Sequence, residues 1–249
     1  MKNNIVYNNI TFNFEKKNIL VVGGSRGIGL GVVKAFANAG AMVFYISRSP
    51  LIESSIKKIV HIPVDLSNEE EIKKVFNIID DYGGIDILIN SAAINYINKF
   101  EKISSKEWDD VLKINLKSVF LLSQSALIRM KKNNAGKIVN ISSIAGRHRS
   151  YVSGAHYVAS KAGLIGLTKQ LAYEVAEFNI NINAVCPSQT MTDLLLESMN
   201  QKEQKELIKN IPIKRLATVN DQVGPILFLC SDAASYITGT YIDINGGQI

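Results

Sequence analysis

The sequence predicts an α/β fold of the Rossmann type, a doubly wound parallel sheet of seven strands with helices on both faces. Three observations predict it. Short β-branched runs alternate with helical segments along the chain, a glycine-rich stretch follows the first run, and 47% hydrophobic with 20% charged residues is globular composition. We expect one dinucleotide-binding domain over residues 1–249, with a polar N-terminal extension over 1–17 and a substrate-loop region over 188–210.

Each expected element follows from its own pattern. Runs rich in valine and isoleucine predict strands over Ile19–Val22, Met42–Ile46, Ile59–Val64, Ile85–Ile89, Lys137–Ile141, Ile180–Val185 and Tyr241–Ile244. Apolar residues at helical spacing predict helices over Ile28–Ala39, Glu69–Tyr82, Lys106–Lys132, Ala155–Phe178 and Asp221–Leu229. Any helix that starts near Pro50 should be only a turn or two. In this fold, ligands bind beyond the carboxyl ends of the strands.

The glycine-rich stretch from Gly23 to Gly29 lies between the first strand and the first helix. In that context glycines let a pyrophosphate approach the backbone at a helix N-terminus. The alternative, a turn that is merely flexible, explains less because the stretch is flanked by an apolar strand and an apolar-periodic helix. The stretch therefore predicts a dinucleotide site.

The residues after the second strand indicate which dinucleotide is bound. An acid there would bind the ribose hydroxyls of NAD, but the strand ends in Ser47-Arg48. Arg48, together with Arg26 in the glycine stretch, suits a 2′-phosphate, because a guanidinium pairs bidentately with phosphate oxygens. We therefore expect NADP(H), with NAD(H) as the alternative if both arginines are solvated. Asp65, after the third strand, either contacts adenine or caps the following helix through Ser67.

Tyr157 and Lys161 stand four residues apart in a segment expected to be helical, so one turn places the phenol and the ammonium on the same face. A free phenol titrates near ~10, but a neighbouring cation stabilises the phenolate and lowers its pKa. Such a phenol exchanges a proton with a carbonyl or alcohol oxygen. Because this spacing is also common on exposed helix faces, it indicates a catalytic pair only in combination with the other motifs of the chain.

Composition argues against several other classes of protein. The net charge of +6 comes from lysines interleaved with acids along helical segments, which is typical of solvated faces and not of a nucleic-acid surface. No apolar run reaches a membrane span and the first 17 residues are polar, so we expect a cytoplasmic protein. Cys186 and Cys230 lie in apolar segments and should be buried free thiols. Three scattered histidines predict no metal site.

Several motifs occur in a fixed order: the glycine-rich stretch, Asn90 to Ala93, Asn115, Ser142-Ser143, Tyr157-x-x-x-Lys161 and Pro187. Together they resemble the short-chain dehydrogenase/reductase family, in its single-domain branch, over nearly the whole chain. The resemblance implies an enzyme that interconverts a ketone and a secondary alcohol by hydride transfer. It also implies cofactor contacts from Gly23, Ser25, Arg26, Gly27, Ile28, Gly29, Arg48, Asp65, Leu66, Asn90, Ala92, Tyr157, Lys161, Pro187, Ser188 and Thr192.

The resemblance also assigns catalytic roles. Tyr157 would donate or accept the proton, and Lys161 would tune its pKa and bind the nicotinamide ribose. Ser143 would polarise the substrate oxygen, in preference to Ser142, because the family serine stands directly before an apolar-Ala-Gly stretch. Asn115 would hold a water of a proton relay; alternatively, its side chain satisfies the backbone of a bent helix.

The chain departs from the family pattern at five positions, none of which removes a catalytic atom. Val22, Ser91, Ala93, Ser188 and Asn245 stand where the family usually has Thr, Asn, Gly, Gly and Asp. The first and third lie in loops that we expect to pack together. Thr192 matches a cofactor-binding position in the family, although it would also serve as a helix cap before Asp193.

The substrate is the least determined part of the prediction. We expect a small polar molecule, such as a sugar, polyol or hydroxy acid, contacted by Ser143, Arg147, His148, Arg149, Tyr157 and Gln189. The cations at 147–149 would alternatively face solvent or another subunit. Apolar residues over 191–199 would form a lid or the inner face of a short helix.

Two other functions compete with this one. The first is 3-oxoacyl-[acyl-carrier-protein] reduction, although Asn134 and Phe178 stand where we would align the basic carrier-docking residues, with Lys131, Lys132 and Lys137 nearby. The second is NADP binding without catalysis, which has no need of an intact catalytic set. The resemblance further implies a homotetramer assembled through the long helices, with a dimer as the alternative.

Overall fold

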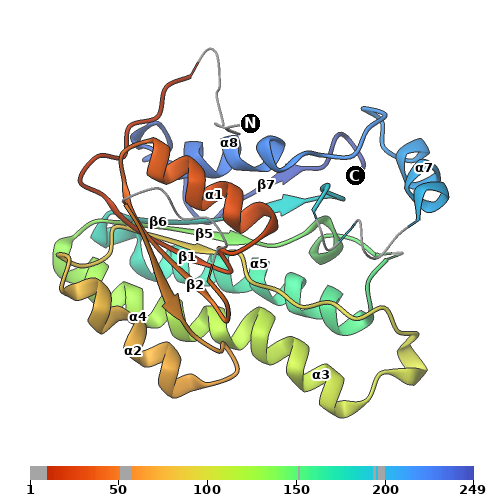
Figure 1. Cartoon of the computed structure of the whole chain (residues 1–249), viewed down its shortest axis with the longest axis horizontal. Coiled ribbons are helices and arrows are strands. Elements are labelled where there is room, and N and C mark those ends of the chain that lie inside the picture. Colours follow the sequence, from red (N-terminus) through yellow and green to blue (C-terminus); the bar gives the residue numbers. More distant parts are fainter. Residues whose placement is uncertain (1–9, 51–57, 151, 193–194, 196–199) are drawn as a thin grey trace.

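The structure is a computed structural model that describes residues 10–50, 58–150, 152–192, 195 and 200–249. Seven parallel strands form one sheet in the order β3-β2-β1-β4-β5-β6-β7 (Figure 1). Their bounds are β1 (Asn18–Val22), β2 (Met42–Ser47), β3 (Ile59–Pro63), β4 (Ile87–Asn90), β5 (Gly136–Ile141), β6 (Ile180–Pro187) and β7 (Tyr241–Ile244). Strand order reverses between β1 and β4, which makes the sheet doubly wound and confirms the predicted fold class.

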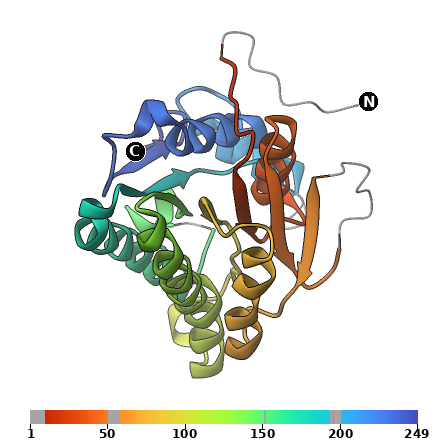
Figure 2. The same cartoon turned by 90° about the vertical axis from the view of Figure 1, so that its left-hand side faces the viewer.

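Helices cover both faces of the sheet, as the two views show (Figures 1 and 2). One face carries α1 (Gly27–Asn38) and α8 (Val219–Cys230), and the other carries α2 (Glu69–Asp80), α4 (Ser118–Asn133) and α5 (Ala155–Val175). Alternate residues of β1 divide between the two cores: Ile19 and Val21 pack toward α1, and Leu20 and Val22 pack toward α2 and α4. Burial on both faces explains why the strands read as continuous apolar runs.

The helix predicted over Lys106–Lys132 is interrupted. It consists of α3 (Ser105–Leu112), a π-helical segment (Lys113–Lys117) and α4, with Asn115 fully buried in the middle segment. A π segment inserts one extra residue into the helical ladder and has no local sequence signal, so periodicity could not reveal it. By length and composition alone, Ser105–Asn133 is the one stretch of the described residues apolar enough to cross a membrane. Its buried residues pack in the core beside β4 and β5.

Other elements differ from the expectation in smaller ways. Helix α7 (Gln201–Lys209) was not predicted. Asn200 and Glu203 form a capping box at its start, and their spacing in the sequence is a signal for a helix N-terminus. The predicted polar extension is not uniformly solvated: Phe14 is buried and packs edge-on against Phe36, with ring centroids 4.8 Å apart. Any turn of helix after Pro50 lies outside the described residues. Short 3₁₀ helices complete the chain: η1 (Phe100–Lys102), η3 (Ile144–Gly146), η4 (Ala176–Phe178) and η5 (Asp232–Ala234).

Candidate active site

A cleft of about 1080 Å³ lies at the carboxyl edge of the sheet. It is lined by the segments that follow β1 through β6 and by the C-terminal tail after β7. Parallel strands all end at this edge, so loops that are distant in sequence meet there. Of the described residues predicted to bind cofactor, nearly all line this cleft, and the exception is Asn90.

The glycine stretch is a tight cradle at the start of α1. Gly23 has a positive φ of 80°, and a Cβ on it would stand 2.7 Å from the Cα of Ala92 in the loop after β4. A Cβ on Gly29 would stand 2.1 Å from the Gly23 carbonyl oxygen. These close approaches show that the loops after β1 and β4 pack together, as predicted, and that larger residues are excluded.

The N-terminus of α1 is open toward the cleft. Arg26 occupies the N-cap position in an extended conformation, its side chain makes no capping bond, and the first turn contains no acidic residue. The first N–H groups of the helix are therefore left for an anion, and the helix dipole favours negative charge there. A dinucleotide's pyrophosphate fits this cradle, in which Gly23, Ser25, Gly27 and Ile28 would hold it.

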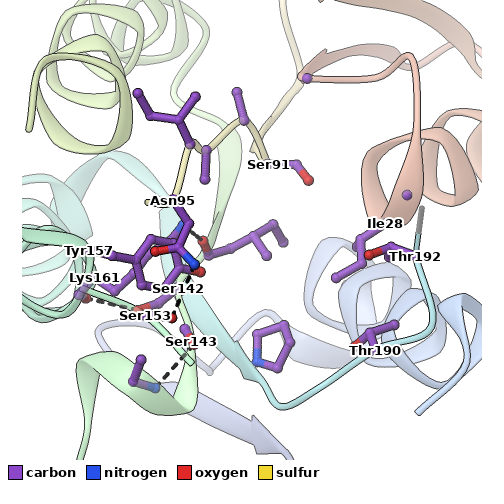
Figure 3. A pocket seen from close by; sticks show the side chains of 18 of the residues that line it. Ile28, Ser91, Asn95, Ser142, Ser143, Ser153, Tyr157, Lys161, Thr190 and Thr192 are labelled. Atoms are coloured by element: carbon purple, nitrogen blue, oxygen red, sulfur yellow. Dashed lines mark hydrogen bonds between the residues drawn. The ribbon is translucent and has the colours of Figure 1, made fainter. Parts of the chain in front are cut away.

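Residues after β6 close the opposite side of the cradle. Pro187, Ser188 and Gln189 line the cleft, as does Thr192, whose Cγ2 would stand 3.3 Å from a Cβ on Gly27. Figure 3 shows Thr192 beside Ile28 across the cleft from the tyrosine. Asp193, the start of the helix that Thr192 would cap, lies outside the described residues, as do most of the predicted lid residues between 193 and 199.

The adenosine end of the cleft is exposed and charged. Arg26, Arg48 and Asp65 are all exposed and line it, together with Leu66. Asp65 accepts a hydrogen bond from the Ser67 main-chain N–H at 2.8 Å. This bond, followed by weaker attraction to Arg48, holds the Asp65 pKa below its ordinary value. The bond to Ser67 agrees with the alternative of a structural role for Asp65, although the N-cap of the helix is Asn68, whose side chain accepts from the Glu70 N–H.

At the other end, Ser143, Tyr157 and Lys161 come together (Figure 3). The Ser143 hydroxyl is within hydrogen-bonding reach of the Tyr157 phenol and caps η3 by accepting from the Ala145 N–H at 3.1 Å. The neighbouring Ser142 is buried and donates to the Lys161 carbonyl at 2.9 Å. This division of roles supports the choice of Ser143 as the serine that meets the substrate.

Close packing holds these groups in place. A Cβ on Gly146 would stand 2.6 Å from the main-chain carbon of Lys161, so η3 lies directly on α5. The Lys161 ammonium donates to the Ile141 carbonyl at 2.7 Å and lies 5.6 Å from the centre of the Tyr157 ring. Ser143, Tyr157 and Lys161, which are predicted to be catalytic, are thus positioned by backbone contacts between β5, η3 and α5.

Burial dominates the electrostatics of this end. It lowers the pKa of Lys161 to about 8 and raises the pKa of Tyr157, against a smaller lowering by the hydrogen bond to Ser143. The phenol is therefore protonated at neutral pH. The prediction that Lys161 lowers the Tyr157 pKa is therefore not borne out, because burial raises it; the Lys161 ammonium, 5.6 Å from the ring centre, is nevertheless placed to stabilise a phenolate.

Asn115 lies behind the cleft and does not line it. Its side-chain oxygen accepts from the Ile94 N–H at 2.8 Å, and its amide nitrogen donates to the Ile94 carbonyl at 2.9 Å and the Ser160 hydroxyl at 3.1 Å. The side chain thus satisfies the backbone of the loop after β4, and not that of its own bent helix. A water held by Asn115 remains a prediction.

Asn90 also points away from the cleft. Its amide donates to Asn140 at 2.8 Å in the buried layer between the sheet and α5. Its side chain therefore acts within the core, contrary to the expectation of a side-chain cofactor contact.

The predicted substrate residues divide into two groups. Arg147 points away from the cleft: it pairs with Asp243 and lies 4.5 Å from the centre of the Tyr241 ring in β7, so its assignment to the substrate was wrong. His148, Arg149 and Gln189 do line the cleft.

Three residues that line the cleft were not predicted. Asn95 and Ser153 stand beside Tyr157, and the Asn95 amide donates to the Ser153 hydroxyl at 3.3 Å (Figure 3). The third is Gln248 in the C-terminal tail. The rule that loops meet at the carboxyl edge could have found Asn95 and Gln248.

Both cysteines are free and buried, as predicted. Among the residues that the structure describes, no group of three or more His, Cys, Asp or Glu side chains could hold a metal ion.

The fold and the site together define a nucleotide-dependent oxidoreductase. A family model described as enoyl-(acyl carrier protein) reductase, from the short-chain dehydrogenases/reductases, matches residues 22–248. The chain belongs to the short-chain dehydrogenase/reductase family and is an oxidoreductase acting on CH–OH and C=O groups.

Three relatives illustrate the range of this similarity. The chain is 39% identical over 245 residues to the 3-oxoacyl-[acyl-carrier-protein] reductase FabG of Aquifex aeolicus, covering 92% of this chain and 96% of that one. It resembles the structure of ElxO with NADP bound, with a TM-score of 0.88 and 31% identity over 94% of this chain and 98% of that chain. It also resembles the ligand-free aldohexose dehydrogenase of Thermoplasma acidophilum, with a TM-score of 0.87, 31% identity and 94% coverage of both chains.

Proposed function

We propose that this protein is an NADP(H)-dependent oxidoreductase that interconverts a small polar ketone and its secondary alcohol. The observation that carries the proposal is the meeting of Ser143, Tyr157 and Lys161 in the cleft that also contains the glycine cradle. The test is NADPH consumption with a panel of ketosugars, keto acids and thioesters, repeated with Tyr157→Phe. Turnover that survives unchanged in the variant would contradict the proposal. NADPH binding without turnover of any substrate in the panel would instead favour the alternative of a protein that binds NADP without catalysis.

The geometry suggests a sequence of events for reduction. NADPH supplies a hydride to the carbonyl carbon when bound. Ser143 donates a hydrogen bond to the carbonyl oxygen, and the protonated Tyr157 transfers its proton to that oxygen as negative charge develops. Lys161, held by the Ile141 carbonyl, stabilises the resulting phenolate. Oxidation of the alcohol reverses these steps.

The preference for NADP(H) is supported by charge at the adenosine end. Arg26 and Arg48 both line the cleft, and the residues Ser47-Arg48-Ser49 contain no acid to bind a ribose diol. Guanidinium groups bind a phosphate dianion bidentately. The use of NADP by ElxO, whose structure is similar, fits this proposal.

A polar substrate is supported by the side chains around the phenol. Asn95 and Ser153 line the cleft beside Tyr157 (Figure 3), and His148, Arg149 and Gln189 line the same cleft. Hydroxyl and amide groups can bind the hydroxyls of a sugar or hydroxy acid. Arg149→Ala should raise the KM for an anionic substrate and leave that for a neutral one unchanged. An equal effect on both would show that Arg149 does not recognise the charge of the substrate.

The relatives named 3-oxoacyl-[acyl-carrier-protein] reductase favour a second candidate. At the positions where carrier-docking residues would align, Asn134 ends α4 in a left-handed conformation, and Phe178 is covered by the Lys131 ammonium at 4.6 Å. Neither supplies a guanidinium, although Lys131 itself is basic. An acetoacetyl-pantetheine thioester decides between the candidates: fast turnover that is lost in Tyr157→Phe would favour acyl reduction.

We also propose that the chain assembles as a homotetramer through α4 and α5. Phe120 of α4 and Leu167 of α5 line a shallow, mainly apolar groove, together with Leu112 of α3 and Leu116 of the π segment. Phe120 is 43% exposed in the isolated chain. Gly166 lies in the same groove, and a Cβ there would meet nothing within 4 Å. Light scattering should give a tetramer for wild type and a smaller species for Gly166→Arg. A monomeric wild type would contradict the proposal.

A further inference from the structure

The residue before the catalytic tyrosine is a buried histidine with two defined partners. His156 is fully buried as the second residue of α5. Its Nδ1 accepts the main-chain N–H of Tyr157 at 2.8 Å, and its Nε2 lies 2.7 Å from the Oε1 of Glu107. An Nδ1 that accepts a hydrogen bond places the proton on Nε2, which donates it to the carboxylate. The imidazole therefore bridges the start of α5 to α3.

Glu107 is a fixed partner for this histidine. It lies in the first turn of α3, where its main-chain N–H donates to the Ser104 hydroxyl at 3.1 Å. Its two oxygens also lie 2.9 Å from the amide nitrogen of Asn98, in the loop after β4. The hydrogen bond from His156, followed by that from Asn98, holds the Glu107 pKa below its ordinary value, so the acceptor is ionised. The carboxylate thus joins the loop, α3 and α5.

The surroundings leave the imidazole little freedom. A Cβ on Gly154 would stand 2.4 Å from its Cε1, so the residue that caps α5 has to be glycine. The Gly154 N–H donates to the Tyr96 carbonyl at 3.0 Å, and the Tyr96 ring lies edge-on to the imidazole at 6.2 Å. Tyr96 also lines the cleft. The first turn of α5 is therefore held against the cleft wall from two sides.

We infer that Glu107 and His156 form a positioning pair that fixes the first turn of α5 and thereby aims the Tyr157 phenol at Ser143. The first N–H groups of a helix lack α-helical partners within it. The Tyr157 N–H donates to the Gly154 carbonyl at 3.1 Å, and the imidazole gives it a second, closer acceptor at 2.8 Å. Neither residue touches the substrate. A displacement of about 1 Å at a reacting group lowers the rate by up to about 100-fold. The inference rests on the proposed role of Tyr157.

Three substitutions separate the contacts. Glu107→Leu removes the acceptor and leaves the Nε2 proton unpaired, whereas Glu107→Gln keeps an oxygen that can accept it. His156→Asn keeps an acceptor near the position of Nδ1 but is too short to reach Glu107. Glu101→Leu makes the same chemical change at an exposed site in η1 and is the matched control.

Hydrogen exchange tests the inference without any substrate. The peptide over residues 153–160 should exchange at least about tenfold faster in Glu107→Leu and His156→Asn than in wild type, whereas peptides from α8 should not change. Glu107→Gln and Glu101→Leu should exchange as wild type. Wild-type protection of this peptide in Glu107→Leu, or equal loss in Glu107→Gln, would overturn the inference.

Turnover supplies a second readout, with 2,3-butanedione and NADPH as the probe. Glu107→Leu should lower kcat by about 10- to 100-fold with an unchanged KM for NADPH, and Glu107→Gln should restore most of the loss. In a Tyr157→Phe background, Glu107→Leu should cause no further loss of residual turnover. A further loss by the same factor would show that the pair does not act through Tyr157. If Tyr157→Phe alone retained full turnover, the proposed function would fail while the exchange result still reported on the pair.

Discussion

The two ends of the cleft are built in different ways. At the catalytic end, Lys161 is 2% exposed and is held by main-chain contacts with β5, and η3 is packed too closely on α5 to admit a methyl group at Gly146. At the adenosine end, Arg26, Arg48 and Asp65 are exposed. In the proposed enzyme, chemistry depends on preorganised, buried groups, whereas the choice of cofactor depends on charges that can change without disturbing the core.

The largest effect should come from removing the phenol. Tyr157→Phe keeps the ring in place but removes the only proton that it can give, so kcat should fall by about 100- to 10,000-fold. Binding of NADPH, measured by fluorescence titration, should remain within a few-fold of wild type. Loss of NADPH binding would show that Tyr157 supports the cleft as well as the reaction.

The buried lysine predicts a pH dependence of stability. Burial lowers the pKa of Lys161 from 10.5 to about 8, so between these pH values the unfolded chain binds more protons than the folded one. The free energy of unfolding of the ligand-free protein should therefore rise with pH across this window. Between about pH 7 and about pH 9.5, wild type should gain on the order of 2 kcal/mol relative to Lys161→Met, measured by urea unfolding. Parallel pH profiles for the two proteins would contradict the assigned shift.

The contact between η3 and α5 can be tested with one methyl group. In Gly146→Ala, the added Cβ meets the main chain of Lys161 at 2.6 Å and of Ala162 at 2.9 Å, which cannot yield as a side chain would. We expect a loss of about 1–3 kcal/mol in stability together with reduced kcat, because Ser143 moves with η3. Thermal unfolding and turnover should change together. A fall in stability with unchanged kcat would show that the packing of η3 on α5 does not control the position of Ser143 during catalysis.

The smallest effect should come from the adenosine end. Arg48→Ala should raise the KM for NADPH by about tenfold and leave that for NADH and the melting temperature unchanged, since the side chain is exposed. Lys132→Ala, which removes an exposed charge remote from the cleft, is the control. If Arg48→Ala retained the wild-type preference for NADPH, the assignment of the 2′-phosphate to this residue would be refuted.

Much of the molecule could be predicted from local sequence. Runs of β-branched residues predicted all seven strands to within a few residues, because strands buried on both faces must be apolar throughout. The glycine stretch predicted the cradle, because only glycine permits the approaches at Gly23 and Gly29. The Tyr157 and Lys161 spacing predicted their common face, because helical geometry fixes it within one turn.

Contacts between residues that are far apart in the sequence could be known only from the tertiary structure. The Arg147 side chain could have pointed into the cleft or toward β7. Its ion pair with Asp243, which is far away in the sequence, holds it against β7. The π segment around Asn115 and the link from Glu107 to His156 likewise depend on how α3 packs against α5. A sequence determines the local periodicity and backbone freedom of each segment. The partners of its polar side chains depend on the packing of elements that have no local pattern in common.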